Sequence, residues 1–360
     1  MKNQFSDEVI ELLASAFLAA WQDFDSRRFS SALSNGFPAL ELKDRINLVA
    51  DTLHAELPDD YPTALDTVVS VAEAGVEGFA AWPLCSFVER HGLDHPKESL
   101  DAMHSLTQQF SCEFAIRPFL DRHLEATLER LRAWTADPEE TVRRLPSEGT
   151  RPILPWGPKV QVLSDDPSIG IDLIGDLCLD PSEVVRRSVA NHLNDVAKTD
   201  ADLVVATLRK WTKLHPEIEP SLVRHALRSL VKAGHPAALQ LLGFTTDAKI
   251  DVTQFACEPS TISLGQQIEL TAVIASAGEL DQLLVVDFIV HHVSASGSTS
   301  PKVFKWTTVG IAPADSVTLT KRRTIATAST RKYHAGSHRV DLQVAGVVVA
   351  TTQFELRDSS

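Results

Sequence analysis

Sharp signatures of cofactor-dependent enzymes are missing from this 360-residue chain. It has no glycine-rich phosphate loop, no Gly-x-Ser-x-Gly and no His-Glu-x-x-His, which argues against nucleotide binding, a hydrolase nucleophile elbow and a zinc peptidase. Its four cysteines stand far apart, without the paired spacing of a zinc site or the density of a disulfide scaffold. We therefore expect reduced, mostly buried thiols. The thirteen histidines are scattered as well. We therefore predict no metal and no cofactor.

Long apolar runs are also missing. No stretch of 18 apolar residues occurs, and the first residues lack the basic-then-apolar order of a signal peptide. We therefore expect a cytoplasmic protein with no membrane contact.

Basic residues are outnumbered, because the net charge is −14. The excess of acid is uneven, however. Residues 1–104 carry 7 Lys and Arg against 18 Asp and Glu, whereas residues 105–235 carry 17 against 19. Since phosphate binding depends on local clusters of Lys and Arg, a basic groove in the middle of the chain is compatible with this total.

Helical periodicity and a repeat dominate the first 245 or so residues. The segment Asp137–Arg144 matches Asp180–Arg187 after a shift of 43 residues, and Pro220–Leu227 resembles a third, shorter copy. A period of about 40–47 residues with two helices per unit is typical of HEAT-type solenoids, in which neighbouring pairs bury one another's apolar faces. The sequence predicts an all-α, HEAT-like helical repeat domain over residues 1–247.

From about residue 248 the apolar period changes from 3.6 to 2, which predicts strands. The runs are Thr261–Leu264, Gln267–Val273, Leu283–Val290, Val303–Val309, Ser316–Ile325 and Val340–Phe354. About seven strands over residues 248–360 are the size of an immunoglobulin-like β-sandwich. The predicted architecture is therefore multidomain, with a helical solenoid followed by an all-β sandwich.

Basic side chains recur with the repeat, and a solenoid would align them along one strip that meets successive DNA phosphates. The predicted DNA-binding residues of this strip are Arg143, Arg144, Arg151, Lys159, Arg186, Arg187, Arg224 and Arg228. The alternative is that these arginines form salt bridges between helices with Glu139, Glu140 and Glu183.

Three further side chains are candidates for catalysis. Glu113 stands in an apolar run, so its carboxylate either pairs with Arg117 or points into a cavity. Asp195 lies two and a half turns beyond Arg186 on the predicted inner helix of the second repeat. Trp156 lies in a loop, where its ring reaches a ligand or plugs the gap between repeats. For both acids, structural pairing is the alternative.

Three blocks of sequence, taken in order, resemble the AlkC branch of the HEAT-like alkylpurine DNA glycosylases. They are Glu113–Phe119, Val142–Trp156 and Val185–Lys198, and the resemblance covers roughly residues 1–245. Longer members of this branch add an immunoglobulin-like domain. Arg117, Asn191 and Asn194 lie in these blocks, and we count them among the candidate DNA-binding residues.

The resemblance implies excision of N3- and N7-alkylated purines, 3-methyladenine above all, from duplex DNA without base flipping. Carboxylates such as Glu113 and Asp195 would stabilise the oxocarbenium-like sugar, with Trp156 beside them. Because no lysine nucleophile is indicated, the enzyme implied is a monofunctional glycosylase of base excision repair. Its partner would be double-stranded DNA that contains alkylated bases, and a monomer is the expected state.

An alternative of another class is a HEAT-type protein-interaction scaffold without catalysis, whose acidic residues 1–104 would suit a basic partner. Two roles are open for the predicted sandwich as well. It either caps the last helix pair or contacts DNA through its loop at residues 329–339, where Arg331, Lys332 and His334 suit the minor groove.

Overall fold

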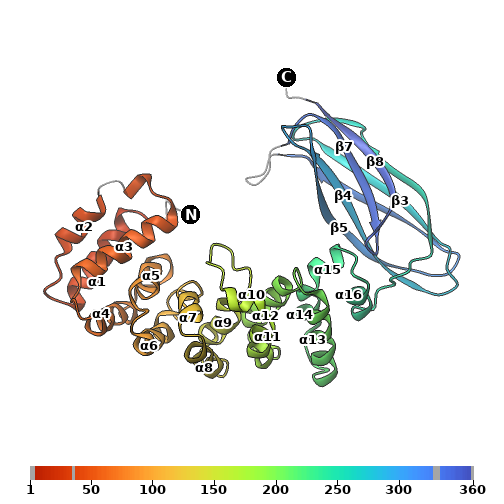
Figure 1. Cartoon of the computed structure of the whole chain (residues 1–360). Coiled ribbons are helices and arrows are strands. Elements are labelled where there is room, and N and C mark those ends of the chain that lie inside the picture. The colour runs from red at the N-terminus through yellow and green to blue at the C-terminus, as the bar shows by residue number, and fades with distance from the viewer. Residues whose placement is uncertain (1–4, 35–36, 327–332, 358–360) are drawn as a thin grey trace. The chain divides into compact units, whose positions relative to one another are not determined.

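The computed structural model describes residues 5–34, 37–326 and 333–357, and its contacts divide the chain into two compact units. The first comprises residues 1–199 and 211–226, and the second comprises residues 200–210 and 227–360. The predicted order of helices followed by strands is confirmed (Figure 1). In the described ranges, none of the helices is both long and apolar enough to cross a membrane.

The helices occupy the described part of the chain before residue 250. The α-helices are α1 (Asp7–Ala20), α2 (Ser26–Ser34), α3 (Leu42–Glu56), α4 (Tyr61–Glu73), α5 (Trp82–His91), α6 (Pro96–Leu106), α7 (Arg117–Arg122), α8 (Leu124–Trp134), α9 (Glu140–Gly149), α10 (Gln161–Asp165), α11 (Ser168–Ile174), α12 (Glu183–Val196), α13 (Ala201–Leu214), α14 (Pro220–Ala226), α15 (Arg228–Lys232) and α16 (Pro236–Leu241). Short 3-10 helices are η2 (Phe37–Ala39), η3 (Gly78–Ala81) and η4 (Gly175–Leu177).

The three copies of the sequence repeat form equivalent helices of the first unit. They are α9, α12 and α14, and each packs against the next (Figure 1). On α12 the buried positions Val185, Val189, Leu193 and Val196 recur every three or four residues, so one face of the helix enters the core. The Ser182 hydroxyl accepts a hydrogen bond from the Val184 N–H at 3.2 Å and caps this helix. The HEAT-like solenoid is confirmed.

The strands form two sheets in the second unit. They are β1 (Ile250–Glu258), β2 (Thr261–Ser263), β3 (Gln267–Ser276), β4 (Gln282–Val293), β5 (Thr299–Ile311), β6 (Ser316–Thr324), β7 (Gly336–Val344) and β8 (Val347–Arg357). One sheet has the order β1-β3-β6 and the other β2-β8-β7-β4-β5. The predicted sandwich is therefore confirmed.

Two details of the strand prediction are corrected. The first strand, Ile250–Glu258, was missed, because its side chains show only weak alternation between buried and exposed positions. The run Val340–Phe354 divides into β7 and β8 at a turn, where Ala345 and Gly346 have positive φ angles of 48° and 85°. The domain boundary at residues 247 and 248 stays a prediction.

All four cysteines are free and buried, as predicted. Cys85 and Cys112, which stand 27 residues apart in the sequence, place their sulfur atoms 3.4 Å from one another in the core of the first unit. Burial raises the pKa of the Cys112 thiol well above its ordinary value. This thiol therefore stays protonated and serves as a small apolar core residue.

Candidate active site

Two arginines at equivalent positions of the 43-residue repeat make equivalent contacts with the backbone. Arg143 of α9 and Arg186 of α12 each donate through Nη1 to both carbonyls of the Asp-Pro turn before their own helix, at 2.6 to 2.9 Å. Arg143 also pairs with both carboxylate oxygens of Asp180 in the next repeat, at 2.7 and 3.2 Å. The salt-bridge alternative therefore holds for Arg143, with Asp180 as its partner instead of Glu139 or Glu140.

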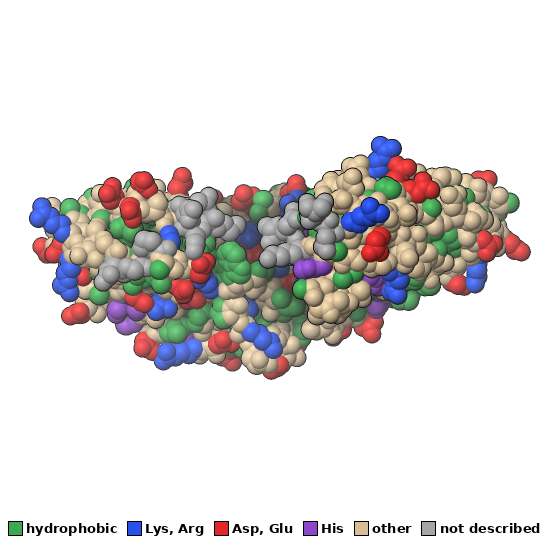
Figure 2. Space-filling view, turned by 90° about the horizontal axis from the view of Figure 1, so that it is seen from above, with side chains coloured by type: hydrophobic (Ala, Val, Ile, Leu, Met, Phe, Trp, Pro, Cys, Tyr) green, Lys and Arg blue, Asp and Glu red, His purple; other side chains and the backbone are tan. Residues whose placement is uncertain are grey.

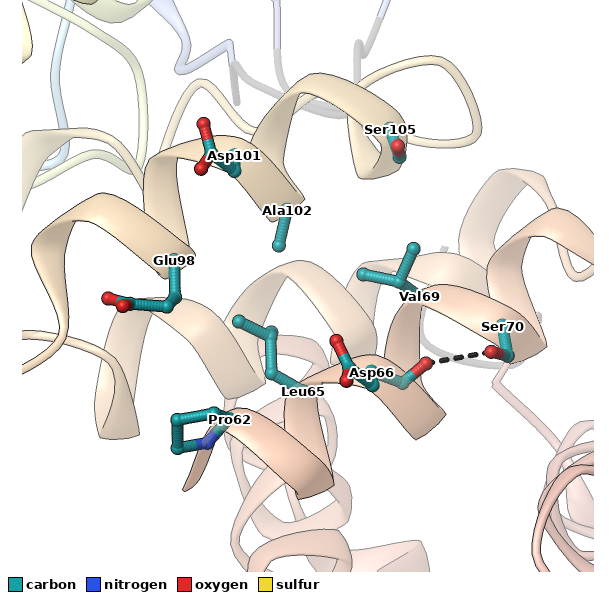
Figure 3. A pocket seen from close by; sticks show the side chains of 9 residues that line it. All are labelled: Pro62, Leu65, Asp66, Val69, Ser70, Glu98, Asp101, Ala102 and Ser105. Carbon is teal, nitrogen blue, oxygen red and sulfur yellow. Dashed lines mark hydrogen bonds between the residues drawn. The ribbon is translucent and has the colours of Figure 1, made fainter. Parts of the chain in front are cut away.

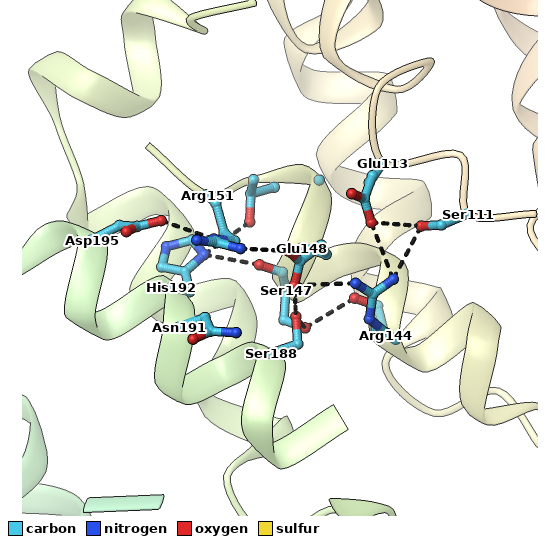
Figure 4. A network of polar contacts seen from close by, with 12 residues as sticks. Ser111, Glu113, Arg144, Ser147, Glu148, Arg151, Ser188, Asn191, His192 and Asp195 are labelled. Atoms are coloured by element: carbon cyan, nitrogen blue, oxygen red, sulfur yellow. Dashed lines mark hydrogen bonds and ion pairs between the residues drawn. The ribbon is translucent and has the colours of Figure 1, made fainter. Parts of the chain in front are cut away.

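Glu113 lies in the turn between α6 and α7 and is held by Arg144 of α9 (Figure 4). Its Oε2 accepts hydrogen bonds from Ser111 Oγ at 2.9 Å and from Arg144 Nη1 at 3.1 Å. Its Oε1 accepts none from the residues that the structure describes, and 16 % of the side chain is exposed. The pairing with Arg117 that we considered does not form. One oxygen of Glu113 is left for water or a ligand.

Glu148 of α9 connects Arg144 to Arg151. It is buried, its Oε1 accepts from Arg151 Nη1 at 2.5 Å, and its Oε2 accepts from Ser188 Oγ at 2.6 Å and lies 3.4 Å from Arg144 Nη2. Sequence reasoning passed over Glu148. Its spacing offered a signal, because residues four before and three after an acid lie on the same side of a helix, and both are arginines here.

Asp195 of α12 is the most enclosed of these carboxylates, with 2 % of its side chain exposed. Its Oδ2 accepts from Arg151 Nε at 2.8 Å, and its Oδ1 accepts from Lys198 Nζ at 2.8 Å. The structural pairing that we weighed for this acid is therefore present. Two cations hold its negative charge in a fixed place.

Together these contacts make one continuous charge network, in which acids and bases alternate (Figure 4). Its members in order are Glu113, Arg144, Glu148, Arg151, Asp195 and Lys198. The network joins three segments of the sequence: the turn before α7, helix α9 with the start of the loop that follows it, and helix α12 with the turn that follows it. The two candidate catalytic acids are its first and fifth members.

His192 of α12 lies beside the network (Figure 4). It is fully buried, and burial lowers its pKa to about 4, so the ring is neutral at physiological pH. Its Nδ1 lies 3.1 Å from the carbonyl of Ser147, to which it donates, and its Nε2 has no hydrogen-bond partner within the described ranges. A Cβ at Gly170 would come within 2.7 Å of the ring, so this glycine gives His192 its room.

Arg117 has a different role from the one predicted. Only 1 % of the residue is exposed, so it cannot reach a phosphate. Its Nε donates to the carbonyl of Pro158 at 2.5 Å, and its Nη1 donates to those of Gly149 and Arg151 at 2.7 and 2.9 Å. Burial lowers its pKa to about 10. The predicted DNA contact is corrected to an internal clamp on the backbone.

Trp156 lies in the loop between α9 and α10 and is 60 % exposed. Its ring makes no aromatic contact with the described residues, so it does not plug a gap between repeats. Its φ of 67° is unusual for a side chain of this size, and its carbonyl accepts a hydrogen bond from Lys43 Nζ at 2.8 Å. The ring is therefore presented to solvent.

The other predicted DNA-binding residues fall into two groups by burial. Arg151 and Asn194 are buried, at 9 % and 3 % exposure, so direct phosphate contacts are corrected for both. The exposed or half-buried ones are Arg144, Lys159, Arg186, Arg187, Asn191, Arg224, Arg228 and His334. Their DNA contacts stay predictions. Arg331 and Lys332 lie outside the described residues.

Partners already occupy several members of this second group, among them Arg144 and Arg186 as described above. Arg187 forms an exposed ion pair with Glu183 at 2.7 Å, as the salt-bridge alternative expected, and Asn191 Oδ1 lies 2.8 Å from His225 Nε2. In Figure 2, acidic and basic side chains are interspersed over the helical unit wherever the grey residues leave it open to view. That face shows no continuous basic strip among its described residues.

A hollow of about 430 Å³ lies between α4 and α6, away from the network (Figure 3). Carboxylates of Asp66, Glu98 and Asp101 stand at its edges, among small and apolar side chains. Asp101 pairs with Lys97 at 2.9 Å and also with Arg130, so part of this negative charge is balanced. In the described ranges, no three His, Cys, Asp or Glu side chains converge in a way that could hold a metal ion.

Comparisons with known proteins cover the whole chain. A family model described as the C-terminal Ig-like domain of the uncharacterised protein YhaZ matches residues 251–358. The uncharacterized protein YhaZ of Bacillus subtilis is 33 % identical over 357 residues, which are 99 % of this chain and of that protein. Among solved structures, the alkylpurine DNA glycosylase AlkC of Pseudomonas fluorescens, bound to DNA with an abasic site analog, matches with a TM-score of 0.93. It is 34 % identical, with 99 % of both chains covered.

Proposed function

The chain belongs to the AlkC family of alkylpurine DNA glycosylases, and from this we propose that it is a monofunctional glycosylase of base excision repair. Its substrates are cationic N3- and N7-alkylated purines, 3-methyladenine foremost, which it excises from duplex DNA without base flipping. The observation that supports this proposal is the charge network, which links Glu113 to Asp195 through Arg144, Glu148 and Arg151. The expected state is a monomer.

The chemistry required is modest, because an alkylated purine that carries a positive charge needs no protonation to leave. When the bond from C1′ to the base breaks, its electron pair neutralises the base and the sugar becomes an oxocarbenium-like cation. A fixed carboxylate attracts this cation more strongly than it attracts the uncharged sugar, so it lowers the barrier. Water then attacks C1′, loses its proton and leaves an abasic site.

The two carboxylates have different environments, and this supports different roles. Asp195 has a cation on each oxygen and is almost fully buried, so it suits a fixed negative charge that acts on the sugar through space and not by contact. Glu113 keeps Oε1 unoccupied by the described residues, so it suits orienting the attacking water and accepting its proton. The exposed ring of Trp156 suits a contact with the sugar or the lesion.

The proposal is tested by incubating the purified protein with methylated duplex DNA and measuring released 3-methyladenine. Glu113→Gln and Asp195→Asn should each slow single-turnover excision by ~10- to 1000-fold while DNA affinity changes little, because the interaction exists mainly in the transition state. Glu98→Gln, in the acidic hollow, is the matched control and should be as fast as the unchanged protein.

One result would count against this function, and two would count against the residues assigned to it. Absence of base release by the unchanged protein would favour a protein-binding scaffold. Unchanged rates in both acid variants would remove these residues from the site. Equal losses of rate and of melting temperature would assign them a purely structural role.

A further inference from the structure

The loop of residues 150–160, which we call the aromatic loop, presents Trp156 on a strained turn. The Gly157 N–H donates to the Leu154 carbonyl at 3.1 Å, Pro155 holds the second position, and Trp156 has a φ of 67° at the third. This is the pattern of a type II turn, whose third position favours glycine or asparagine. A tryptophan at this position costs stability, and such strain is found where a side chain has a function.

Two cations hold the backbone of the aromatic loop. Arg117 binds carbonyls at both ends of it, those of Gly149 and Arg151 at the start and that of Pro158 near the end. Lys43 binds the tip, because its Nζ donates to the carbonyl of Trp156 at 2.8 Å. Lys43 belongs to α3, 113 residues earlier in the chain.

The ammonium group of Lys43 is itself kept in place by its surroundings. It lies 4.9 Å from the centre of the Phe114 ring, in a cation–π contact. Its charge also acts on Glu89 of α5, whose pKa is raised by burial and lowered in part by Lys43. A lysine side chain with a ring, a carboxylate and a carbonyl around it loses less conformational freedom when it forms this hydrogen bond than one that extends into water.

We propose that Lys43 is a positioning residue that locks the turn of Trp156, so that the indole ring meets the DNA in one fixed orientation. The proposal rests on the proposed glycosylase function for its catalytic consequence, but the lock itself is a property of the free protein. It gives the acidic N-terminal region a part in the active site. The hydrogen bond, the cation–π contact and the left-handed backbone at Trp156 all support it.

The lock is tested first without any substrate, by amide hydrogen exchange of the full-length protein. Lys43→Met keeps the length of the side chain and removes its charge, so exchange in peptides covering residues 150–160 should rise by ~5-fold or more. Lys43→Arg, which restores a donor, should recover part of the protection. Lys97→Met on α6, where the lysine pairs with Asp101, is the control and should leave this loop unchanged. Unchanged exchange in Lys43→Met would overturn the proposal.

A double-mutant cycle then tests whether Lys43 acts through Trp156. Introduced alone, Lys43→Met should slow single-turnover excision by ~10-fold. Introduced together with Trp156→Ala, it should cause no loss beyond that of Trp156→Ala alone. An equal loss in both backgrounds, with the salt dependence of DNA binding reduced by about one unit of slope, would mean that Lys43 contacts a phosphate directly and would overturn the proposal. If the unchanged protein releases no base, the proposed function fails, and hydrogen exchange still decides whether the lock exists.

Discussion

Nη1 of Arg144 lies 3.1 Å from Oε2 of Glu113, so a helix of the sequence repeat fixes the turn that carries a candidate catalytic carboxylate. This contact leads to the first prediction. Arg144→Met should slow excision by ~10- to 100-fold, because the carboxylate loses its orientation, while the salt dependence of DNA binding stays the same. If instead the slope falls by about one unit and the rate constant is retained, Arg144 contacts a phosphate as its sequence position predicted.

The second prediction concerns Glu148, which is buried between two arginines. Glu148→Gln keeps the shape but removes the charge, so we expect a loss of about 1–3 kcal/mol in the free energy of unfolding. Excision should also slow, because Arg144 and Arg151 both lose a partner. Melting and single-turnover measurements on Glu148→Gln and on the exposed control Glu98→Gln check this. Equal behaviour of the two variants would show that the network is not coupled through Glu148.

The third prediction separates arginines that bind DNA from those that hold the repeat together. Arg143→Ala should lower the melting temperature without changing the salt dependence of DNA binding, because its guanidinium is spent on Asp180 and on backbone carbonyls. Lys159→Ala removes an exposed cation and should flatten the salt dependence by about one unit of slope with no loss of stability. Binding titrations at several salt concentrations distinguish the two, and exchanged outcomes would reverse the assignments.

The fourth prediction follows from the pKa of His192, which burial lowers from 6.5 to about 4. Because the folded state disfavours the proton, the neutral ring contributes stability above pH 6.5, and this contribution is lost as the pH falls from 6.5 toward 4. The loss amounts to at most about 3 kcal/mol. Thermal unfolding, followed by the helical circular dichroism signal, should depend less on pH over this range in His192→Leu than in the unchanged protein. Equal pH dependence would contradict a neutral buried ring.

The fifth prediction has the opposite sign and concerns the sandwich. Burial raises the pKa of Asp287 from 3.8 to about 6, against the opposing charges of Lys305 and Lys232. The folded state therefore favours the protonated acid, and the contribution of Asp287 to stability is present below pH 4 and lost as the pH rises to about 6. Asp287→Asn should raise the melting temperature at pH 7, by an amount that corresponds to about 1–3 kcal/mol. A lower melting temperature at pH 7 would show that the charged carboxylate has a stabilising partner.

Much of the candidate site was predictable because its residues belong to local sequence patterns. The repeat placed Arg143 and Arg186 at equivalent positions, and they make equivalent contacts. The apolar setting of Glu113 marked it as unusual, and the structure gives it a fixed partner and an unoccupied oxygen. What failed was the choice of partner. Spacing along one helix suggested Arg117 as the partner of Glu113. In the structure, α9 packs against the turn between α6 and α7, and Arg144 is the partner.

The burial of the arginines was the least predictable feature. Arg117 and Arg144 look alike in the sequence, yet one is 1 % exposed and the other has 27 % of its side chain in solvent. The difference arises because the loop after α9 folds back over Arg117 and offers it three carbonyls. Segments so far apart approach one another only in the folded chain, so no local pattern reveals which cation they enclose.

The sequence by itself determined the order of the architecture, helices in a 43-residue repeat followed by alternating strands, because periodicity is a local property of the chain. It also determined which residue types are available: two carboxylates, one loop tryptophan and a set of arginines. Only the tertiary structure decided how these combine. It joined Glu113 to Asp195 through Glu148, enclosed Arg117, and brought Lys43 to the carbonyl of Trp156. The contacts of Glu148 with its two arginines are local, but those of Glu113 with Arg144, Arg151 with Asp195, Arg117 with Gly149 and Lys43 with Trp156 each cross more than 30 residues. A hydrogen bond at such separation exists only after the core has packed.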